Sequence, residues 1–567
     1  MHFLRNLFAN LVSLIVFSVI TVLVVLISLL SVGDDFEVTD NSILHIKVNG
    51  DLKDQSKGTQ IFKEANCQSD NKSIEKAIQL AVKDTLIKAI YLEVGAVEGS
   101  LANIESLRRS LLEYKKSGRK IISYSTAMSQ IGYHLSSVAD SIYLGNMTGF
   151  EWKGIGAQLL YFKSMLSKIG VKAEPIRVGK FKSAIEPFIM DSISTENEYQ
   201  VKELINDVWM NICSDIQKSR GISKKSLEFV ANDLGVLTSE EALMYGFVDA
   251  IKYEDEVKKV FKKLFFGNEK YITVKQLINA NSSVSLADDK LVIVNAEGSI
   301  IDMPSESDIS GFQYGKIFDD ILKDESVKAM VIRINSPGGS AKASEELWRK
   351  IKLIQEKVPV IISMGNVAAS GGYYMATAGD KIFAENNTIT GSIGVFGLMF
   401  NVSELTENIG VNVEKVKTHK MSDFPSFDRS LTSKEKTRVQ LGINKVYDVF
   451  LDRVAKGRGL SIEKVEGLAS GRVWTGRQAK ENGLVDSIGG LNMAIETAKQ
   501  AADIKTYKLV ELPKILSPIE QVVKHFSNQE VRLPEPFANY NYMIQNPDFF
   551  KTFHTPQVRL PFVISIK

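Results

Sequence analysis

An internal repeat is the feature that most limits how this chain of 567 residues can fold. Short segments of the first half recur in the second half, in the same order and at an almost constant distance. The tripeptide Ile-Ile-Ser at 121–123 recurs 240 residues later, and so does the pair Gly132-Tyr133. Residues 238–249 match residues 475–486 at an offset of 237. A drift of only three residues over this span indicates a tandem duplication of one domain.

Each copy has the sequence pattern of an α/β domain. Runs rich in β-branched residues predict strands, and the amphipathic stretches between them predict helices. The strands are expected at 43–48, 89–94, 120–123, 291–294, 329–334 and 358–363, and the clearest helices at 100–117 and 341–357. Strands that alternate with helices predict βαβ units and a largely parallel sheet in each copy.

The matching segments set the expected domain boundaries. The first α/β repeat is expected at 40–268 and the second at 291–512, joined by a polar linker at 269–290. Residues 513–567 form a tail that is rich in Pro, Phe and Tyr and has no counterpart in the repeat. The pattern assigns no role to this tail.

The N-terminus predicts a membrane anchor. No charged residue lies between Arg5 and Asp34, and residues 7–32 are mostly Leu, Val, Ile and Phe. This run exceeds the ~20 residues that a helix needs to cross a bilayer. With Arg5 before the run and acidic residues after it, residues 1–6 are expected in the cytoplasm and the repeats on the other side. A cleaved signal peptide is the alternative, but the apolar run is about twice the usual length of a signal core.

Composition excludes several classes of partner. The formal net charge of +2 provides no basic surface, so nucleic acid is not an expected partner. The two cysteines, Cys67 and Cys213, are expected as free buried thiols rather than as a disulfide. No His-Glu-x-x-His segment and no cluster of Cys and His is present, so neither a metal nor another cofactor is expected.

Two glycine-rich clusters distinguish the second copy from the first. Ala-Ser-Gly-Gly at 369–372 and Pro-Gly-Gly at 337–339 each follow a predicted strand, whereas the first copy has Gln130 at the position of Ser370. A serine nucleophile needs an exposed hydroxyl at a turn, small neighbours and nearby free N–H groups. Tight turns in a packed domain are the alternative, but two such clusters in one copy favour a nucleophilic Ser370.

The base that would activate this serine is expected to be a lysine. None of the six histidines lies in a motif that would pair it with Ser370, so a Ser/His/Asp triad is disfavoured. A desolvated lysine can serve instead. Lys182 lies in Gly-Lys-Phe-Lys-Ser-Ala-Ile-Glu-Pro-Phe at 179–188, and Lys420 lies at the same place in the second copy, at an offset of 238. Ser392 aligns with Gly154 at that offset.

Several segments together resemble one known family. They are Asn-Ser-Pro-Gly-Gly at 335–339, residues 364–373, Thr-Gly-Ser-Ile-Gly-Val-Phe-Gly at 390–397, residues 470–476 and Gly-Leu-Val-Asp at 483–486. The chain resembles the signal peptide peptidase A family, also called protease IV, in its long two-repeat form. The resemblance implies that each repeat has the fold of the Clp protease and crotonase group.

The resemblance also implies roles for individual residues. Ser370 would be the nucleophile, and Lys182 of the first copy would be the general base, with Phe181 where the family has Tyr. Ser392 would orient the lysine. The N–H groups of Gly339 and Gly371 would form the oxyanion hole. Short, single-copy relatives take their lysine from the place of Lys420, which is therefore the alternative base.

The resemblance implies a function as well. We expect a membrane-anchored serine endopeptidase with a Ser/Lys dyad that degrades cleaved signal peptides and other hydrophobic peptides in or at the membrane. A homotetramer is expected, anchored in a bacterial inner membrane by a single span, with its catalytic part on the periplasmic side. The alternatives are a catalytically inactive, membrane-tethered oligomeric scaffold and crotonase-like chemistry on a thioester.

Overall fold

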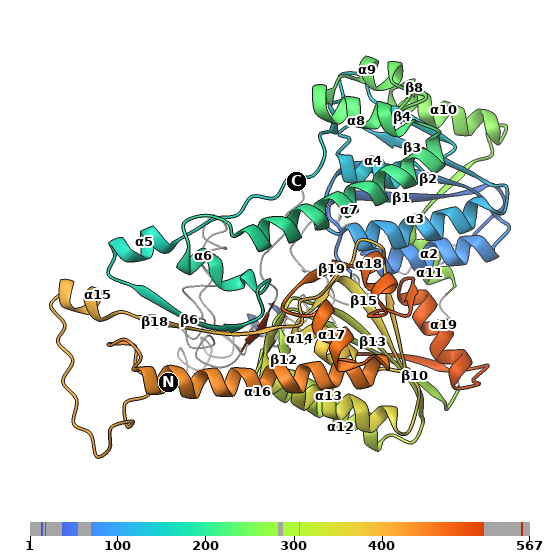
Figure 1. Ribbon diagram of the computed structural model, residues 1–567. Helices are drawn as coiled ribbons and strands as arrows, with labels where there is room; N and C mark the ends of the chain where they lie inside the picture. The colour runs from blue at the N-terminus through green and yellow to red at the C-terminus, as the bar shows by residue number, and fades with distance from the viewer. Residues whose placement is uncertain are drawn as a thin grey trace, which may run out of the picture.

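A computed structural model describes residues 13–14, 17–18, 37–54, 70–281, 287–305, 307–514 and 557–559 (Figure 1). The expected anchor at 7–32 falls almost entirely outside these residues and stays a prediction. Within the described residues, no helix combines the length and the apolar character that crossing a bilayer requires. Cys67 is also outside them, whereas Cys213 is a buried free thiol.

The first repeat is built on a sheet of six parallel strands in the order β8-β4-β3-β2-β1-β9. In chain order these strands are β1 (Ser42–Asp51), β2 (Ile87–Glu98), β3 (Lys120–Ser125), β4 (Ser141–Leu144), β8 (Ala250–Ile251) and β9 (Lys270–Thr273). Both faces of such a sheet are covered, which is why its central strands are apolar almost throughout.

The second repeat has the same strand order. Its parallel strands run β20-β16-β15-β13-β10-β21. They are β10 (Lys290–Glu297), β13 (Val327–Ser336), β15 (Val360–Ala369), β16 (Lys381–Ala384), β20 (Ser487–Ile488) and β21 (Lys508–Leu512). The identical order confirms that the chain is a tandem duplication of one α/β domain.

The linker expected at 269–290 is partly incorporated in the first repeat. Residues 270–273 form β9, which pairs with β1 at the edge of the first sheet, and α11 (Val274–Ala280) follows. β9 takes the place that β21 takes in the second sheet. The short run Tyr271-Ile272-Thr273 was too brief to predict a strand, but pairing with β1 buries Ile272 completely.

Equivalent helices end at equivalent residues in the two repeats. α7 (Thr195–Arg220) and α16 (Ser433–Arg458) are both 26 residues long. Each begins at a side-chain cap, Ser194 or Thr432, and each ends at a left-handed glycine, Gly221 or Gly459. Hydroxyl caps satisfy the free N–H groups of the first turn, and glycine adopts the left-handed angles without a steric penalty.

Each repeat also extends an arm away from its sheet. We call residues 155–190 the first arm and residues 395–430 the second arm. β6 (Lys172–Val178) of the first arm pairs antiparallel with β18 (Val395–Asn401) of the second. Both arms extend to the left of the two sheets in Figure 1. This pairing brings the first repeat's residues 179–188 over the second repeat.

The two repeats are also joined through α7. Leu204 of this helix packs with Ala369 and Val473 of the second repeat in a small buried cluster. Asp207 is fully buried and accepts hydrogen bonds from Thr475 Oγ1 at 2.5 Å and from Arg477 Nε at 3.0 Å. The repeats therefore pack through specific polar contacts as well as through apolar ones.

Candidate active site

Ser370 stands at a sharp turn between β15 and α14 (Gly371–Ala376). Its backbone angles are φ 56° and ψ −114°, a region that residues with a Cβ rarely adopt. The Ser370 N–H donates to the Gly391 carbonyl at 2.8 Å, which helps to hold this turn. Such strain costs about 1–3 kcal/mol and persists only where the surrounding structure enforces it. The serine lies at a turn after a strand, as predicted, but its hydroxyl is buried rather than exposed as expected, because the first arm covers this turn.

Lys182 of the first arm reaches this serine from the other repeat. Its Nζ lies 2.7 Å from Ser370 Oγ, although the two residues are 188 positions apart in the chain. The same Nζ lies 2.9 Å from Ser392 Oγ and 3.0 Å from the Ser392 carbonyl oxygen. All three side chains are fully buried. The structure thus brings together Ser370, Lys182 and Ser392.

Burial holds the pKa of the Lys182 amine well below its ordinary range. None of its described hydrogen-bond partners is a carboxylate that would favour the charged form. A neutral amine has two N–H donors and one lone pair. Two donors are enough for the two Ser392 oxygens, which leaves the lone pair able to accept the proton of the Ser370 hydroxyl.

Glycines leave room for the lysine. A Cβ at Gly471 would lie 2.6 Å from the backbone nitrogen of Lys182. A Cβ at Gly394 would lie 3.3 Å from the side-chain Cδ of Lys182. The Phe181 N–H donates to the Ser470 carbonyl at 2.9 Å, which ties the first arm to the same loop. Both glycines lie in segments that carry the family resemblance.

Glu186 and Gln200 anchor the lysine segment, and the sequence assigned no role to either. Glu186 is fully buried and accepts hydrogen bonds from Ser194 Oγ at 2.6 Å and Asn197 Nδ2 at 3.1 Å. Gln200 donates to the Phe181 carbonyl at 3.1 Å. These bonds fasten the segment to the first turns of α7. The Glu-Pro pair at 186–187 was visible as part of the motif, but Gln200 had no signal.

Gly339 and Gly371 lie in the turns expected for them. Gly371 is the first residue of α14, so its N–H has no acceptor within that helix. Gly339 lies in β14 (Gly338–Ser340), where a Cβ would come within 2.0 Å of the Ile300 carbonyl oxygen of β11 (Ile300–Ile301). Only glycine allows this close approach of the two backbones.

An extended segment of the C-terminal tail lies beside these glycines. β22 (Gln557–Arg559) pairs antiparallel with β14, with Val558 opposite Gly339. Its first residue, Gln557, also pairs with Phe396 of β18 and is buried. The space between β14 and β18 therefore accepts a peptide as an added strand, a mode of recognition that relies on main-chain hydrogen bonds.

In the part of the first repeat that the structure describes, no serine and lysine meet at the equivalent turn. Gln130, at the place of Ser370, accepts hydrogen bonds from the N–H groups of Lys153 and Gly154 at 3.1 and 2.9 Å. The Gln130 side chain thereby occupies the region next to the turn that is equivalent to the one at Ser370. Lys420 is exposed on the second arm, and Ser370 has no hydrogen bond to it in the structure.

Strand pairing corrects the alignment of Ser392. Phe150 pairs with Met128 in the first repeat, and Thr390 pairs with Ala368 in the second. Each residue of the second pair lies 240 positions after its counterpart in the first, so the offset between the repeats is still 240 at this point. Trp152, rather than Gly154, is therefore the counterpart of Ser392. The sequence alignment was wrong here because the offset between the repeats changes from 240 to 238 directly after this point. The triplets Gly-Ile-Gly at 154–156 and Ser-Ile-Gly at 392–394 are alike at the offset of 238, although their first residues are not counterparts.

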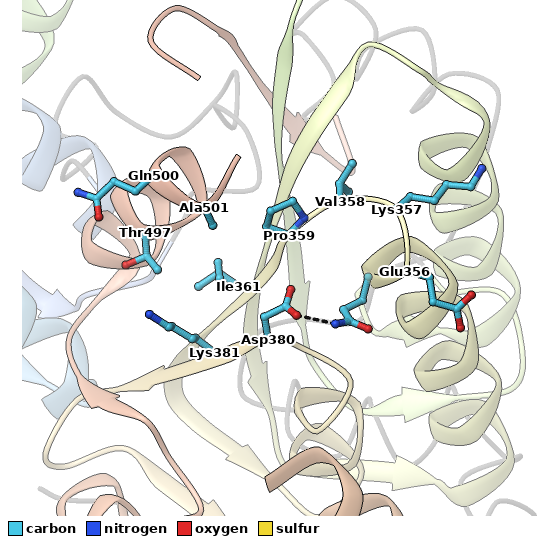
Figure 2. A pocket seen from close by; sticks show the side chains of 11 residues that line it. Glu356, Lys357, Val358, Pro359, Ile361, Asp380, Lys381, Thr497, Gln500 and Ala501 are labelled. Carbon is cyan, nitrogen blue, oxygen red and sulfur yellow. Dashed lines mark hydrogen bonds between the residues drawn. The ribbon is translucent and has the colours of Figure 1, made fainter. Parts of the chain in front are cut away.

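A surface hollow lies at the opposite end of β15. Its lining includes Pro359, Asp380 and Thr497 (Figure 2). Gln355 Nε2 donates to Asp380 Oδ1 at 2.5 Å within this lining. In parallel α/β sheets, ligands bind at the carboxyl ends of the strands, where Ser370 lies, and not at this end. None of the predicted site residues lines this hollow.

Comparisons with known proteins identify the family of this chain. The model of peptidase family S49 matches the chain twice, at residues 113–265 and 352–505. Protease 4 of Haemophilus influenzae is 32% identical over 82% of this chain and 79% of its own length. A chloroplastic serine protease, SPPA, of Arabidopsis thaliana is 32% identical over 85% of this chain and 72% of its own. A candidate signal peptide peptidase of Enterococcus faecium is 34% identical over 44% of this chain and 72% of its own.

Proposed function

Because this chain belongs to peptidase family S49 and is a serine protease, we propose that it cleaves hydrophobic peptides with Ser370 as nucleophile and Lys182 as general base. One observation carries the assignment of these residues. The Lys182 amine lies 2.7 Å from the Ser370 hydroxyl, and both groups are fully buried. Burial lowers the pKa of the amine and thereby favours its neutral form, the form that can accept a hydroxyl proton.

The reaction is acyl transfer through the serine oxygen. Lys182 accepts the hydroxyl proton as Ser370 Oγ bonds to the peptide carbonyl carbon, and the N–H groups of Gly339 and Gly371 stabilise the resulting oxyanion. The ammonium of Lys182 then protonates the leaving amine as the C–N bond breaks. A water molecule, deprotonated by the same lysine, attacks the acyl ester and releases the acid and the serine hydroxyl.

Cleaved signal peptides are the proposed substrates. The apolar run at 7–32 would hold the enzyme in a membrane where such peptides remain after export. The space between β14 and β18 suits an extended peptide backbone. The name of the Enterococcus relative describes the same substrate class. We further propose a homotetramer in a bacterial inner membrane, with the repeats on the periplasmic side and each repeat in the fold of the Clp protease and crotonase group.

The test uses the full chain reconstituted in lipid vesicles with a synthetic signal peptide. We expect mass spectrometry to find fragments cut within the apolar core of the peptide, and no fragments with Ser370→Ala. A serine-directed fluorophosphonate should label the wild type and not this variant. If the probe labels Ser370 while the signal peptide stays intact and soluble peptides are cut, the proposed substrate class is wrong.

The two other functions have less support. An inactive scaffold would not need the strained Ser370 backbone or a fully buried lysine. Crotonase-like chemistry on a thioester would use carboxylates beside the glycine turns, whereas the described hydrogen-bond partners of Ser370 and Lys182 are an amine, hydroxyls and carbonyls.

A further inference from the structure

Arg472 is a charged residue next to the proposed active site that the proposed mechanism does not use. It directly precedes β19 (Val473–Thr475) and is partly buried. The carbon of its guanidinium lies 4.0 Å from the centre of the Trp474 ring, 5.3 Å from that of Tyr199 and 5.7 Å from that of Phe181. In the described parts of the chain, the partners of this guanidinium are aromatic rings rather than carboxylates. We call Arg472 and the three rings the aromatic clamp.

The aromatic clamp joins the two repeats. Arg472 and Trp474 belong to the second repeat. Phe181 lies on the first arm, and Tyr199 lies near the start of α7, which runs beside β19 (Figure 1). A guanidinium is planar and weakly hydrated, so it stacks on aromatic rings, whose faces attract a cation. The clamp therefore fastens the first arm and the start of α7 to the second repeat.

The backbone of Arg472 is also connected to the lysine. The Ser392 N–H donates to the Arg472 carbonyl at 2.7 Å. The two oxygens of Ser392 lie 2.9 and 3.0 Å from the Lys182 amine. Phe181, whose ring belongs to the clamp, directly precedes Lys182 in the chain. Arg472 thus contacts the residue before the lysine through its side chain, and the serine that holds the amine through its carbonyl.

The aromatic clamp has no equivalent at the matching places of the duplication. Strand pairing and the offset of 238 between α7 and α16 set the alignment. The counterparts of Arg472, Trp474, Phe181 and Tyr199 are, in that order, Gly235, Leu237, His419 and Thr437. A contact that the fold of each repeat required would be expected in both copies. The clamp instead occurs where the lysine of the first arm reaches the second repeat.

We propose that Arg472 is a positioning residue for the reaction at Ser370. The aromatic clamp holds the first arm against the second repeat, so that the Lys182 amine stays within hydrogen-bond distance of the Ser370 hydroxyl and away from water. Arg472 acts through Phe181 and Ser392 rather than on the reacting atoms. The inference rests on the proposed function, because it concerns the lysine that serves as the base there.

Loss of the aromatic clamp should change how activity depends on pH. Burial lowers the pKa of the Lys182 amine. Without the clamp, the first arm moves away from the second repeat and water reaches the amine, which favours the charged form and raises the pKa. At a given pH, a smaller fraction of the amine is then neutral. The loss of activity should therefore be large near neutral pH and small at strongly alkaline pH.

The charged groups of the first arm around Lys182 stay in place in this comparison. Arg177 Nη1 donates to the Lys182 carbonyl at 3.4 Å and lies 3.8 Å from a Glu186 oxygen. The Lys180 amine lies 5.2 Å from the centre of the Phe181 ring. The side chains of α7 that hydrogen-bond to this segment through Ser183 are neutral, namely Asn197 and Gln200.

The second repeat places one charged residue beside the lysine. The stretches that contact Lys182 contain no charge other than that of Arg472, and they are 369–371, 391–394 and 470–472. Removal of a nearby positive charge would itself raise the pKa of a lysine. A variant that keeps the charge and loses the clamp is therefore part of the test.

The test measures how fast a serine-directed fluorophosphonate labels Ser370 across neutral and alkaline pH. The full chain is used in detergent with the probe in excess, so the rate constant does not depend on the amount of folded protein. We expect the rate to rise with pH to a plateau. Arg472→Met should move the midpoint of this rise upward by about one pH unit or more, which is a loss of about tenfold near neutral pH.

Variants of Phe181 separate the aromatic clamp from the charge. Phe181→Leu keeps the Arg472 charge and removes the ring, and it should also move the midpoint upward. Phe181→Tyr retains a ring and should keep the wild-type midpoint. The double variant Arg472→Met/Phe181→Leu should move the midpoint little further than Arg472→Met alone, because both changes remove the same contact.

Arg119→Met is the matched control. The carbon of the Arg119 guanidinium lies 4.4 Å from the centre of the Tyr114 ring in the first repeat, and its Nη1 donates to the Ile87 carbonyl at 2.8 Å. The substitution thus removes another arginine that stacks on a ring. It should lower Tm in a thermal melt but leave the midpoint of labelling unchanged.

The outcomes separate this inference from the proposed function. An unchanged midpoint in Arg472→Met would overturn the inference, and so would an equal loss of rate at every pH, which indicates a merely structural role. A shift in Arg472→Met without one in Phe181→Leu would assign the effect to charge alone and would also overturn it. A wild type that the probe does not label would overturn the proposed nucleophile itself.

Discussion

The two repeats have the same strand order but contribute different parts of the proposed active site. The second repeat provides Ser370, Ser392 and the glycine turns, and the first provides only Lys182 on its arm. At the place of Ser370, the first repeat has Gln130, which bonds to the neighbouring backbone. The comparison teaches that duplication allowed one site to be divided between two domains.

The two turns also differ in energetic cost. Ser370 and Ser392 both adopt positive φ angles, and they surround a buried lysine. Gln130 begins α4 (Gln130–Ser136) after a regular cap at Ser129. Backbone strain at the two serines and burial of the Lys182 amine both lower the stability of the folded chain. Each of these costs comes with a more reactive group at the turn of the second repeat. Such costs concentrate at functional sites, which agrees with placing the chemistry in the second repeat.

The largest expected effect on activity distinguishes the turn at Ser370 from the equivalent turn at Gln130. Ser370→Ala should lower kcat/KM for an apolar peptide substrate by a factor of about 10⁴ or more, because the nucleophile is lost. Gln130→Ala, at the equivalent place, should leave kcat/KM within about twofold. Steady-state kinetics on the detergent-solubilised chain measures both. Equal losses in the two variants would contradict the assignment of the chemistry to the second repeat.

The next effect separates the two lysines. Lys182→Met should reduce kcat/KM by about 10²–10⁴, the usual contribution of a general base. Lys420→Met should have no effect, because Lys420 is exposed on the second arm. If Lys420→Met abolished activity and Lys182→Met retained it, the base would belong to the second repeat, in contrast to the observed 2.7 Å contact.

The glycine turns at Gly339 and at its counterpart Gly99 should also differ in their effect on kcat. Gly339→Ala forces a Cβ against the Ile300 carbonyl oxygen and displaces an expected oxyanion donor, so kcat should fall by about 10²–10³. Its counterpart, Gly99, would bring a Cβ to 2.8 Å from only the Asp51 side chain, which can move. Gly99 has a φ of +89°, so Gly99→Ala should lower stability by about 1–2 kcal/mol but change kcat little. Thermal melts of both variants separate misfolding from a local effect.

Ser392→Ala should have a smaller effect. It removes one of the two oxygens that hold the Lys182 amine, while the Ser392 carbonyl remains. We expect a loss of about 10–100-fold in kcat, with KM nearly unchanged, as for other residues that orient a reactive group. Ser392→Thr, which keeps the hydroxyl, should recover part of the loss. A change in KM alone would indicate a role in substrate binding instead.

The smallest expected effect concerns pH and stability. The pKa of Lys182 is lowered on folding, so protons favour the unfolded state, and stability falls as pH falls below the ordinary lysine range. Lys182→Met removes this penalty and should raise Tm by at least about 2–4 °C near neutral pH, with a smaller gain at strongly alkaline pH. Lys420→Met should not change Tm. For the same reason, wild-type activity should rise with pH; an optimum below neutrality would contradict a lysine base.

Much of this molecule followed from its sequence because the information was local. The recurring segments predicted two α/β domains, and the alternation of strands and helices predicted their parallel sheets. The Ala-Ser-Gly-Gly cluster identified Ser370 through its small neighbours, and the structure places this serine at a strained turn before a helix. These patterns depend on backbone geometry within a few residues.

Only the tertiary structure decided which lysine meets the serine. Lys182 and Lys420 occupy matching places in their repeats, yet Lys182 is buried beside Ser370 and Lys420 is exposed. The choice depends on the pairing of β6 with β18, a contact between residues more than two hundred positions apart. The counterpart of Ser392 and the strand formed by 270–273 were likewise decided by pairing with distant strands. A local pattern specifies what a segment can form, but packing between domains determines which groups come into contact.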